Sequence, residues 1–126
     1  MGALASLKVL SLHMNQIGDA GMTAFADAVS SGALASITVL RLGRNQIADA
    51  GLSALASACA NGALPALEKL FLEANLIRDA GMSAFASACA SGALASLKTL
   101  YVDDGQFGTE HPALKVACHK RGINLP

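Results

Sequence analysis

The sequence is poor in charge and in aromatic rings. Of its 126 residues, 14% are charged and 4% are aromatic, and nine Lys and Arg balance nine Asp and Glu. An average soluble protein carries about 25% charged residues. Because hydrophobic residues make up 53% of the chain, it is too apolar to be intrinsically disordered. The absence of a basic excess argues against nucleic acid as a partner.

Two segments lack charge altogether, between Asp49 and Glu68 and between Asp79 and Lys98, and each is 18 residues long. Length alone would nominate both as membrane-spanning helices. Ala, Gly and Ser dominate them, however, so we expect no membrane span. No basic stretch followed by an apolar run opens the chain, so we also expect no secretory signal.

The first residues match one lipidation pattern. Gly2 and Ser6 stand where N-myristoylation requires them. The same Gly-Ala-Leu triplet recurs at Gly32, Gly62 and Gly92. An internal repeat therefore explains the match, and the sequence does not settle whether Gly2 is lipidated.

The sequence contains a clear internal repeat. Leucines recur at intervals of 30 residues, at Leu10, Leu40, Leu70 and Leu100. Residues 32–61 and 62–91 are identical at 17 of 30 positions. A fixed period of this length indicates a solenoid. We expect a single domain over residues 1–126, with units starting near residues 2, 32, 62 and 92.

Each unit has the pattern of a short strand followed by a helix. Leu10 and Leu12 alternate with polar residues, which predicts a strand with one buried face. Asp19 stands where a helix should begin, and an Asp side chain there accepts hydrogen bonds from unpaired first-turn N–H groups. Gly32 lies past the predicted helix end, where a left-handed residue costs glycine little. Apolar residues at helical spacing predict one buried stripe: Met22, Phe25, Ala26 and Val29.

The pattern Leu-x-x-Leu-x-Leu-x-x-Asn-x-Ile, which runs from Leu7 to Ile17, resembles the leucine-rich repeat. The following Asp-Ala-Gly-x-x-Ala-Phe/Leu-Ala is similar to the long subclass found in ribonuclease inhibitor and NOD-like receptors. The resemblance runs from Gly2 to about Gly108. It implies an α/β fold, a right-handed β-α solenoid shaped as a short horseshoe arc, with a parallel inner sheet and outer helices.

An asparagine follows each of the first three predicted strands, at Asn15, Asn45 and Asn75. At a sharp turn its side-chain amide can bond backbone groups of its own and the adjacent coil. The fourth copy has Gly105 at this position.

The two ends of the array differ. Residues 106–126 diverge from the repeat, and we interpret them as a C-terminal cap in which Ile123 and Leu125 add a last short strand. Residues 1–6 resemble only the tail of a unit, so Leu7 and Leu10 should face an open end. An apolar edge of this kind suggests self-association.

The candidates for chemistry are few. Cys59, Cys89 and Cys118 fall on the apolar helix stripe, which predicts small core side chains rather than a metal or redox site. Free buried thiols suit a reducing compartment, so we expect the cytoplasm. The histidines lack metal-ligand spacing, and Asp103, Asp104 and Glu110 lack the alternation of a calcium loop. No nucleophile stands with a base, so we expect no cofactor, no metal and no enzymatic activity.

The remaining candidate is the exposed face of the predicted sheet. Positions flanking the buried leucines point away from the core, and they vary between copies while their neighbours hardly change. Framework positions tolerate the same residue each time, whereas a recognition surface needs different ones. The predicted partner-binding residues are Ser11, His13, Arg41, Arg44, Lys69, Phe71, Glu73, Tyr101 and Asp103.

Within this set, Arg41, Phe71 and Tyr101 should be neighbours on adjacent strands. Arg and Tyr are enriched in binding hot spots, although the two rings could equally stack as ordinary cross-strand packing. The sequence therefore predicts a non-catalytic protein-protein interaction module that binds a protein partner through the concave face of the inner sheet. Two alternatives stay open: a structural spacer or fragment of a longer array, and, by family analogy, a GTPase-activating-type regulator.

Overall fold

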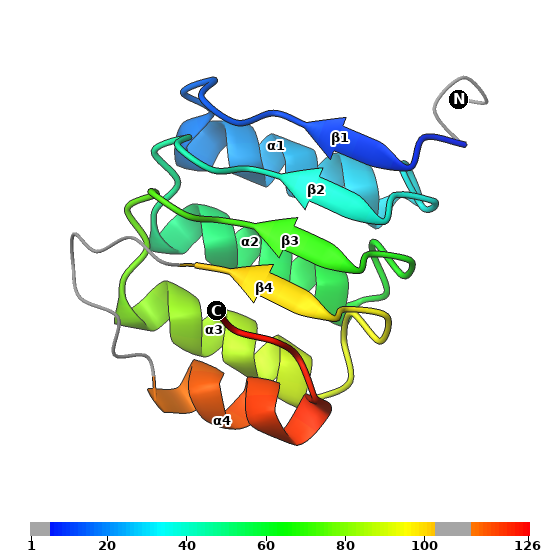
Figure 1. Cartoon of the computed structure of the whole chain (residues 1–126). Coiled ribbons are helices and arrows are strands. Elements are labelled where there is room, and N and C mark those ends of the chain that lie inside the picture. The colour runs from blue at the N-terminus through cyan, green and yellow to red at the C-terminus, as the bar shows by residue number, and fades with distance from the viewer. Residues whose placement is uncertain (1–5, 103–111) are drawn as a thin grey trace.

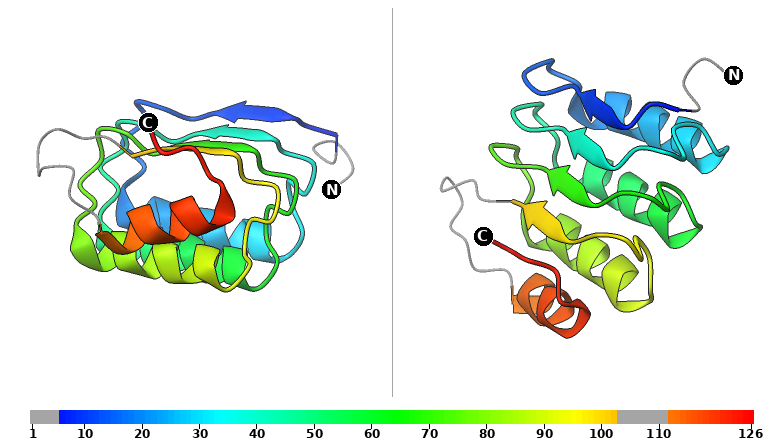
Figure 2. Two further views of the ribbon diagram at one scale, coloured as in Figure 1. Left: turned by 60° about the horizontal axis from the view of Figure 1, so that its bottom comes forward. Right: turned by 45° about the vertical axis from the view of Figure 1, so that its right-hand side comes forward.

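The computed structural model describes residues 6–102 and 112–126, in which short strands alternate with helices (Figure 1). We call each strand with the helix that follows it a coil, so β1 and α1 form the first coil. The elements are β1 (Val9–Ser11), α1 (Gly18–Ser30), β2 (Val39–Arg41), α2 (Asp49–Ala60), β3 (Lys69–Phe71), α3 (Asp79–Ala90), β4 (Thr99–Tyr101) and α4 (Pro112–Arg121). Figure 2 shows the strands in one layer and the helices in a second layer behind it. The predicted β-α solenoid is confirmed.

The strands form one parallel sheet in the order β1-β2-β3-β4. Each step of the register is 30 residues, so Leu10 pairs with Leu40, Leu40 with Leu70 and Leu70 with Leu100. The last three leucines are 0% exposed, and Leu10 is half-buried. The predicted leucine row is therefore confirmed. Leu10 is the least buried of the four because β1 has a neighbouring strand on one side only.

The helices bury the predicted stripe against the back of the sheet. In α1, Met22, Ala26 and Val29 are buried and Phe25 is half-buried. The equivalent residues of α2 and α3 are all buried. Gly32 follows α1 with a φ of +96°, a left-handed conformation that favours glycine. Among residues 6–102 and 112–126, no helix is long and apolar enough to cross a membrane.

Buried asparagines join each coil to the one before it. The Asn45 oxygen accepts a hydrogen bond from Asn15 N (2.8 Å) in the first coil. Its nitrogen donates to Leu12 O in the first coil (2.9 Å) and to Leu42 O in its own (3.0 Å). Asn75 repeats these contacts one coil later. The predicted role, to bond their own and the adjacent coil, is confirmed for Asn45 and Asn75, whereas the Asn15 side-chain nitrogen donates to its own turn.

The helix-start aspartates cap a different helix from the one expected. Asp19 lies inside the first turn of α1, but its Oδ1 accepts hydrogen bonds from Ala48 N and Gly51 N at the start of α2, both 2.8 Å long. Asp49 does the same for α3, at 2.7 and 3.0 Å. The prediction that these residues accept N–H groups at their own helix start is therefore wrong for Asp19 and Asp49. Each carboxylate stabilises the positive end of the next helix in the stack.

The glycine of the Asp-Ala-Gly motif makes room for this contact. A Cβ on Gly51 would lie 2.5 Å from Asp19 Oδ1, and one on Gly81 would lie 2.7 Å from Asp49 Oδ1. Any larger residue would push the carboxylate away from the N–H groups. The Asp of one motif therefore contacts the Gly of the next motif, 32 residues later in the sequence.

The C-terminal helix is fastened by one arginine. Arg121 at the end of α4 donates from Nη1 to Cys89 O (2.7 Å) and Ala93 O (2.8 Å), and from Nη2 to Leu94 O (2.7 Å). These carbonyls belong to the end of α3 and the turn after it, where a helix leaves its last carbonyls unpaired. A cation also suits the negative end of a helix. Sequence reasoning gave Arg121 no such role.

The predicted last strand shrinks to a single bridge. Asn124 pairs with Thr99 of β4 in parallel, through Leu100 N to Asn124 O (2.9 Å) and Asn124 N to Lys98 O (2.8 Å). Ile123 is buried beside it. Of the segment interpreted as a cap, residues 112–126 form α4 and this bridge, while residues 106–111 lie outside the described residues.

The three cysteines are free thiols in the helical core, as predicted. Burial raises the pKa of Cys59 from 9.0 to about 12, and the neighbouring Cys89 adds to this. Burial and then Cys118 raise the pKa of Cys89 to about 11, against an opposing effect of Arg121. Burial raises the pKa of Cys118 as well. A protonated buried thiol is a poor nucleophile and a poor metal ligand.

Replacing Asn45 with alanine should destabilise the fold. Asn45→Ala leaves buried backbone groups of two coils without partners, which we expect to lower the free energy of unfolding by roughly 1–3 kcal/mol. The matched control is Asn15→Ala, because the Asn15 nitrogen bonds only Leu12 O and His13 O of its own exposed turn. Urea unfolding followed by circular dichroism measures both. Equal losses for the two variants would contradict the intercoil role.

The buried thiols should make stability fall in alkali. Between the ordinary thiol pKa of 9.0 and the folded values of about 11 and 12, the unfolded chain loses these protons first. Their contribution to stability is therefore complete below pH 9 and declines above it, by roughly 1 kcal/mol per thiol and pH unit. The double variant Cys59→Val and Cys89→Val tests this, because the first coil has a valine, Val29, at the equivalent position. Its free energy of unfolding, measured with urea between pH 8 and 10.5, should decline less steeply with pH than that of the unaltered chain. An unchanged slope would contradict the assignment.

Candidate functional site

The surface of the sheet turned away from the helices, which we call the sheet face, carries two rows of aligned side chains. Register places Val9, Val39, Lys69 and Thr99 in one row, and Ser11, Arg41, Phe71 and Tyr101 in the other. The predicted rows are therefore adjacent in space as the repeat requires. Ser11, Arg41 and Lys69 are exposed, while Phe71 and Tyr101 are half-buried.

Three neighbouring side chains of the second row form one stack. The Arg41 guanidinium carbon lies 4.5 Å from the centroid of the Phe71 ring. The Phe71 and Tyr101 rings lie parallel, with centroids 4.4 Å apart and an angle of 5° between their planes. Because Arg41 and Tyr101 are on opposite sides of β3, both faces of Phe71 are covered. A partner would meet the ring edges and the guanidinium.

This stack also realises the packing alternative that the sequence left open, since Phe71 and Tyr101 do stack across strands. A cation over an exposed ring contributes about 0.5–1 kcal/mol, and a stacked aromatic pair about 0.5–1.5 kcal/mol. These contacts hold the three side chains in one arrangement before any partner arrives. A preordered surface loses less side-chain entropy on binding.

Glu73 stands beside the stack in an unusual environment. Its carboxylate lies so close over Gly43 that a Cβ there would be 2.5 Å from Oε2. The other oxygen, Oε1, is buried and has no hydrogen-bond partner among the described residues. A buried carboxylate oxygen without a donor is costly. The sequence predicts Glu73 as a site residue but does not show that a glycine at position 43 admits its carboxylate.

The other predicted site residues are dispersed. His13 accepts or donates a hydrogen bond with Ser11 Oγ through Nδ1 (2.9 Å) at the first-coil end of the sheet face. Asp103 lies outside the described residues, as do Asp104 and Glu110. Arg44 leaves the sheet altogether. It is exposed on the loop after β2, with a φ of +57°.

The loops around Arg44 form a second surface, which sequence reasoning missed. A shallow hollow of about 380 Å³ is lined by Met14, Gln16, Arg44, Gln46, Ala74 and Leu76. Met14 is 64% and Leu76 is 41% exposed, among the most exposed large apolar residues described. A signal was available at one position, because Met14, Arg44 and Ala74 are equivalent and differ between copies.

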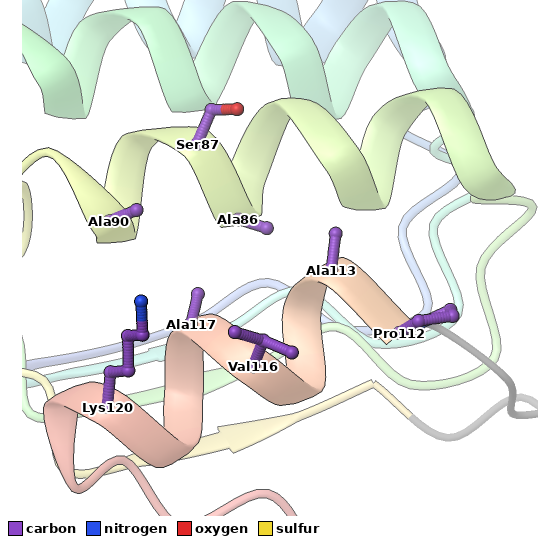
Figure 3. Close-up of a pocket in the computed structure, with 8 residues that line it drawn as sticks. All are labelled: Ala86, Ser87, Ala90, Pro112, Ala113, Val116, Ala117 and Lys120. Atoms are coloured by element: carbon purple, nitrogen blue, oxygen red, sulfur yellow. The ribbon is translucent and has the colours of Figure 1, made fainter.

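A second hollow lies on the helical side, between α3 and α4 (Figure 3). Its volume is about 470 Å³, and its lining is Ala86, Ser87, Ala90, Pro112, Ala113, Val116, Ala117 and Lys120. Only Ser87 and Lys120 bring polar side chains, and these do not make an acid-base pair. In residues 6–102 and 112–126, no group of three or more His, Cys, Asp or Glu is placed to hold a metal ion.

Comparison with protein-family models gives a match over two segments of the chain. Residues 3–26 and 33–56 match a family model described as Leucine Rich repeat. No curated protein matches the sequence. This family model does not identify the narrower subclass found in ribonuclease inhibitor and NOD-like receptors. The two matched segments and the stacked β-α coils together support a leucine-rich repeat protein.

Proposed function

We propose that this protein binds a protein partner through the sheet face, with Arg41, Phe71 and Tyr101 at the centre of the contact. Leucine-rich repeat domains are in general protein-interaction modules and not catalysts. The observation that carries the proposal is the preordered stack of Arg41, Phe71 and Tyr101. The core does not need these side chains, since the sheet buries its leucines on the opposite side.

The chemistry of the surface suggests the chemistry of the partner. Glu73, half-buried beside the stack, brings a negative charge that an Arg or Lys of the partner would match. The aromatic edges of the stack suit an aliphatic or aromatic side chain beside that cation. Lys69, which is exposed on β3, borders the site with positive charge. The partner we propose therefore presents one basic and one apolar side chain together.

The sheet face is small. Four strands about 4.8 Å apart span under about 20 Å, so the face offers less than the roughly 800 Å² per partner of a standard interface. We therefore expect weak binding by this chain alone. The cytoplasm, where the free thiols remain reduced, is the location we propose. No described residue of the sheet face favours the GTPase-activating alternative.

Truncating the stack should weaken peptide binding. Peptides selected from a displayed random library on the unaltered chain should be enriched in Lys or Arg next to an apolar residue. They should bind the double variant Arg41→Ala and Phe71→Ala at least about 10-fold more weakly, the loss expected for hot-spot residues. Fluorescence anisotropy measures this, and circular dichroism should show unchanged helix content.

The matched control lies on the helical side of the molecule. Val116→Ala with Lys120→Ala alters the hollow between α3 and α4 without touching the sheet face, so affinity should stay the same. Glu73→Gln should selectively weaken the binding of the peptides that contain Lys or Arg. If the control variant loses binding and the stack variant does not, the sheet face is the wrong site.

A second role concerns the N-terminal edge, by which we mean the open side of β1 and α1. Leu7, Leu10 and Leu12 are half-buried there, whereas their equivalents in the second coil, among them Leu40 and Leu42, are fully buried. This difference favours the array alternative, in which another coil or a second copy covers the edge.

Self-association through the N-terminal edge can be measured directly. If a second copy covers the edge, sedimentation equilibrium should show mass rising with concentration, and Leu7→Glu should keep the chain monomeric because it buries a charge in the contact. Ser36→Glu, on an equivalent turn away from the edge, is the control. Monomers at all concentrations would exclude a second copy but not another coil.

A further inference from the structure

We propose that the N-terminal edge is a docking site for one more parallel β-α coil, and that this coil supplies an aspartate to the start of α1. The inference rests on the array role proposed above and deepens it by naming the occupant. A difference between the first coil and the two that follow it supports the proposal.

The intercoil contact occurs twice with the same chemistry. In both cases the upstream coil provides an Asp carboxylate to two N–H groups at the next helix start. In both cases the downstream Asn oxygen accepts from the upstream backbone. A docked coil would therefore have two defined groups to meet: the first N–H groups of α1, and the side chain of Asn15.

Both groups lack such partners in the first coil. The Asn15 nitrogen bonds only its own turn, and no described residue donates to its oxygen. The residues equivalent to the donors Ala48 and Gly51 are Gly18 and Gly21. No side chain among the described residues accepts a hydrogen bond from the backbone N–H of either glycine. Gly18 N donates instead to Asn45 O in the second coil (2.7 Å).

The start of α1 has a different conformation as a result. Ala48 and Arg78, which receive an upstream carboxylate, precede their helices with extended backbone, at φ −114° and −121°. Gly18 has a φ of +67° and is itself the first residue of α1, with Ile17 before it in the helical region. Of α1, α2 and α3, only the helix without an upstream Asp starts in this way. Glycine at position 18 permits both conformations.

A second copy of the chain does not offer this chemistry. Its C-terminal end is covered by α4, whose last turn carries the basic residues His119, Lys120 and Arg121, and by the Asn124 bridge. A copy turned about a two-fold axis would pair β1 antiparallel with β1. It would then set the two α1 helices antiparallel, so Asp19, which lies in the first turn of α1, would be far from Gly18 of the other copy.

The test adds a coil to the full chain. A copy of residues 32–61 is fused ahead of Gly2, so that its terminal Asn precedes glycine as Asn61 precedes Gly62. The copied Asp49 then stands in register with Gly18 and Gly21. The matched control carries Ala in place of that copied Asp49. Gly18→Ala is introduced into the 126-residue chain and into both extended chains, and Tm is measured for all six proteins.

Gly18→Ala should lower the Tm of the 126-residue chain by about 3–6 °C, because a Cβ is strained at this φ. Space is not the cause, since a Cβ there would meet nothing within 4 Å. In the chain extended with Asp, position 18 should become extended like Ala48, so the substitution should cost nothing. With Ala in place of the copied Asp49, the loss should return.

Two failures have separate meanings. If the added coil raises Tm but Gly18→Ala costs the same in all three backgrounds, the aspartate assignment is wrong while the array role survives. If the added coil leaves Tm unchanged, the array role fails with it. A dimer of the 126-residue chain in which Gly18→Ala costs no stability would give the edge to a second copy and overturn the proposal.

Discussion

The structure depends on hydrogen bonds that run from one coil to the next. Each short strand has only three residues, too few to form a stable sheet alone. The buried Asn45 and Asn75 side chains fix each turn to its neighbour, and Asp19 and Asp49 fix each helix start. Both kinds of contact require a constant spacing of about 30 residues. The repeat length is therefore a bonding constraint as well as a packing one.

Much of this could be predicted from the sequence, because period and side-chain type carry it. The leucine row, the parallel order, the helix stripe and the asparagine contacts all follow from residues that recur at fixed intervals. The capping direction of Asp19 could not be predicted, since its partners at Ala48 and Gly51 are near in space only after the coils stack. The three hydrogen bonds of Arg121 to carbonyl groups could not be predicted for a different reason. Residues 106–126 depart from the repeat, so no second copy reveals their pattern.

The candidate site was predicted to a similar degree. Register placed Arg41, Phe71 and Tyr101 side by side, and alternation placed them on the outer side of the sheet. Neither pattern encodes the angle between two rings or the unpartnered oxygen of Glu73, because these depend on rotamers chosen by local packing. Arg44 shows the limit of reasoning by variability alone. It varies between copies as the sheet positions do, but its left-handed backbone carries it to the loops.

The sheet face and the N-terminal edge are separate surfaces, yet the repeat couples them. A coil docked on β1 would extend the sheet by one strand, and with it each row of exposed side chains. The Asp and Asn contacts use backbone and side chains at the strand-to-helix turns, so they leave the Ser11 and His13 end of the sheet face open. Recognition area would therefore grow with each coil while the intercoil chemistry stays constant. Constant residues at the turns and variable residues on the strands are what such growth requires.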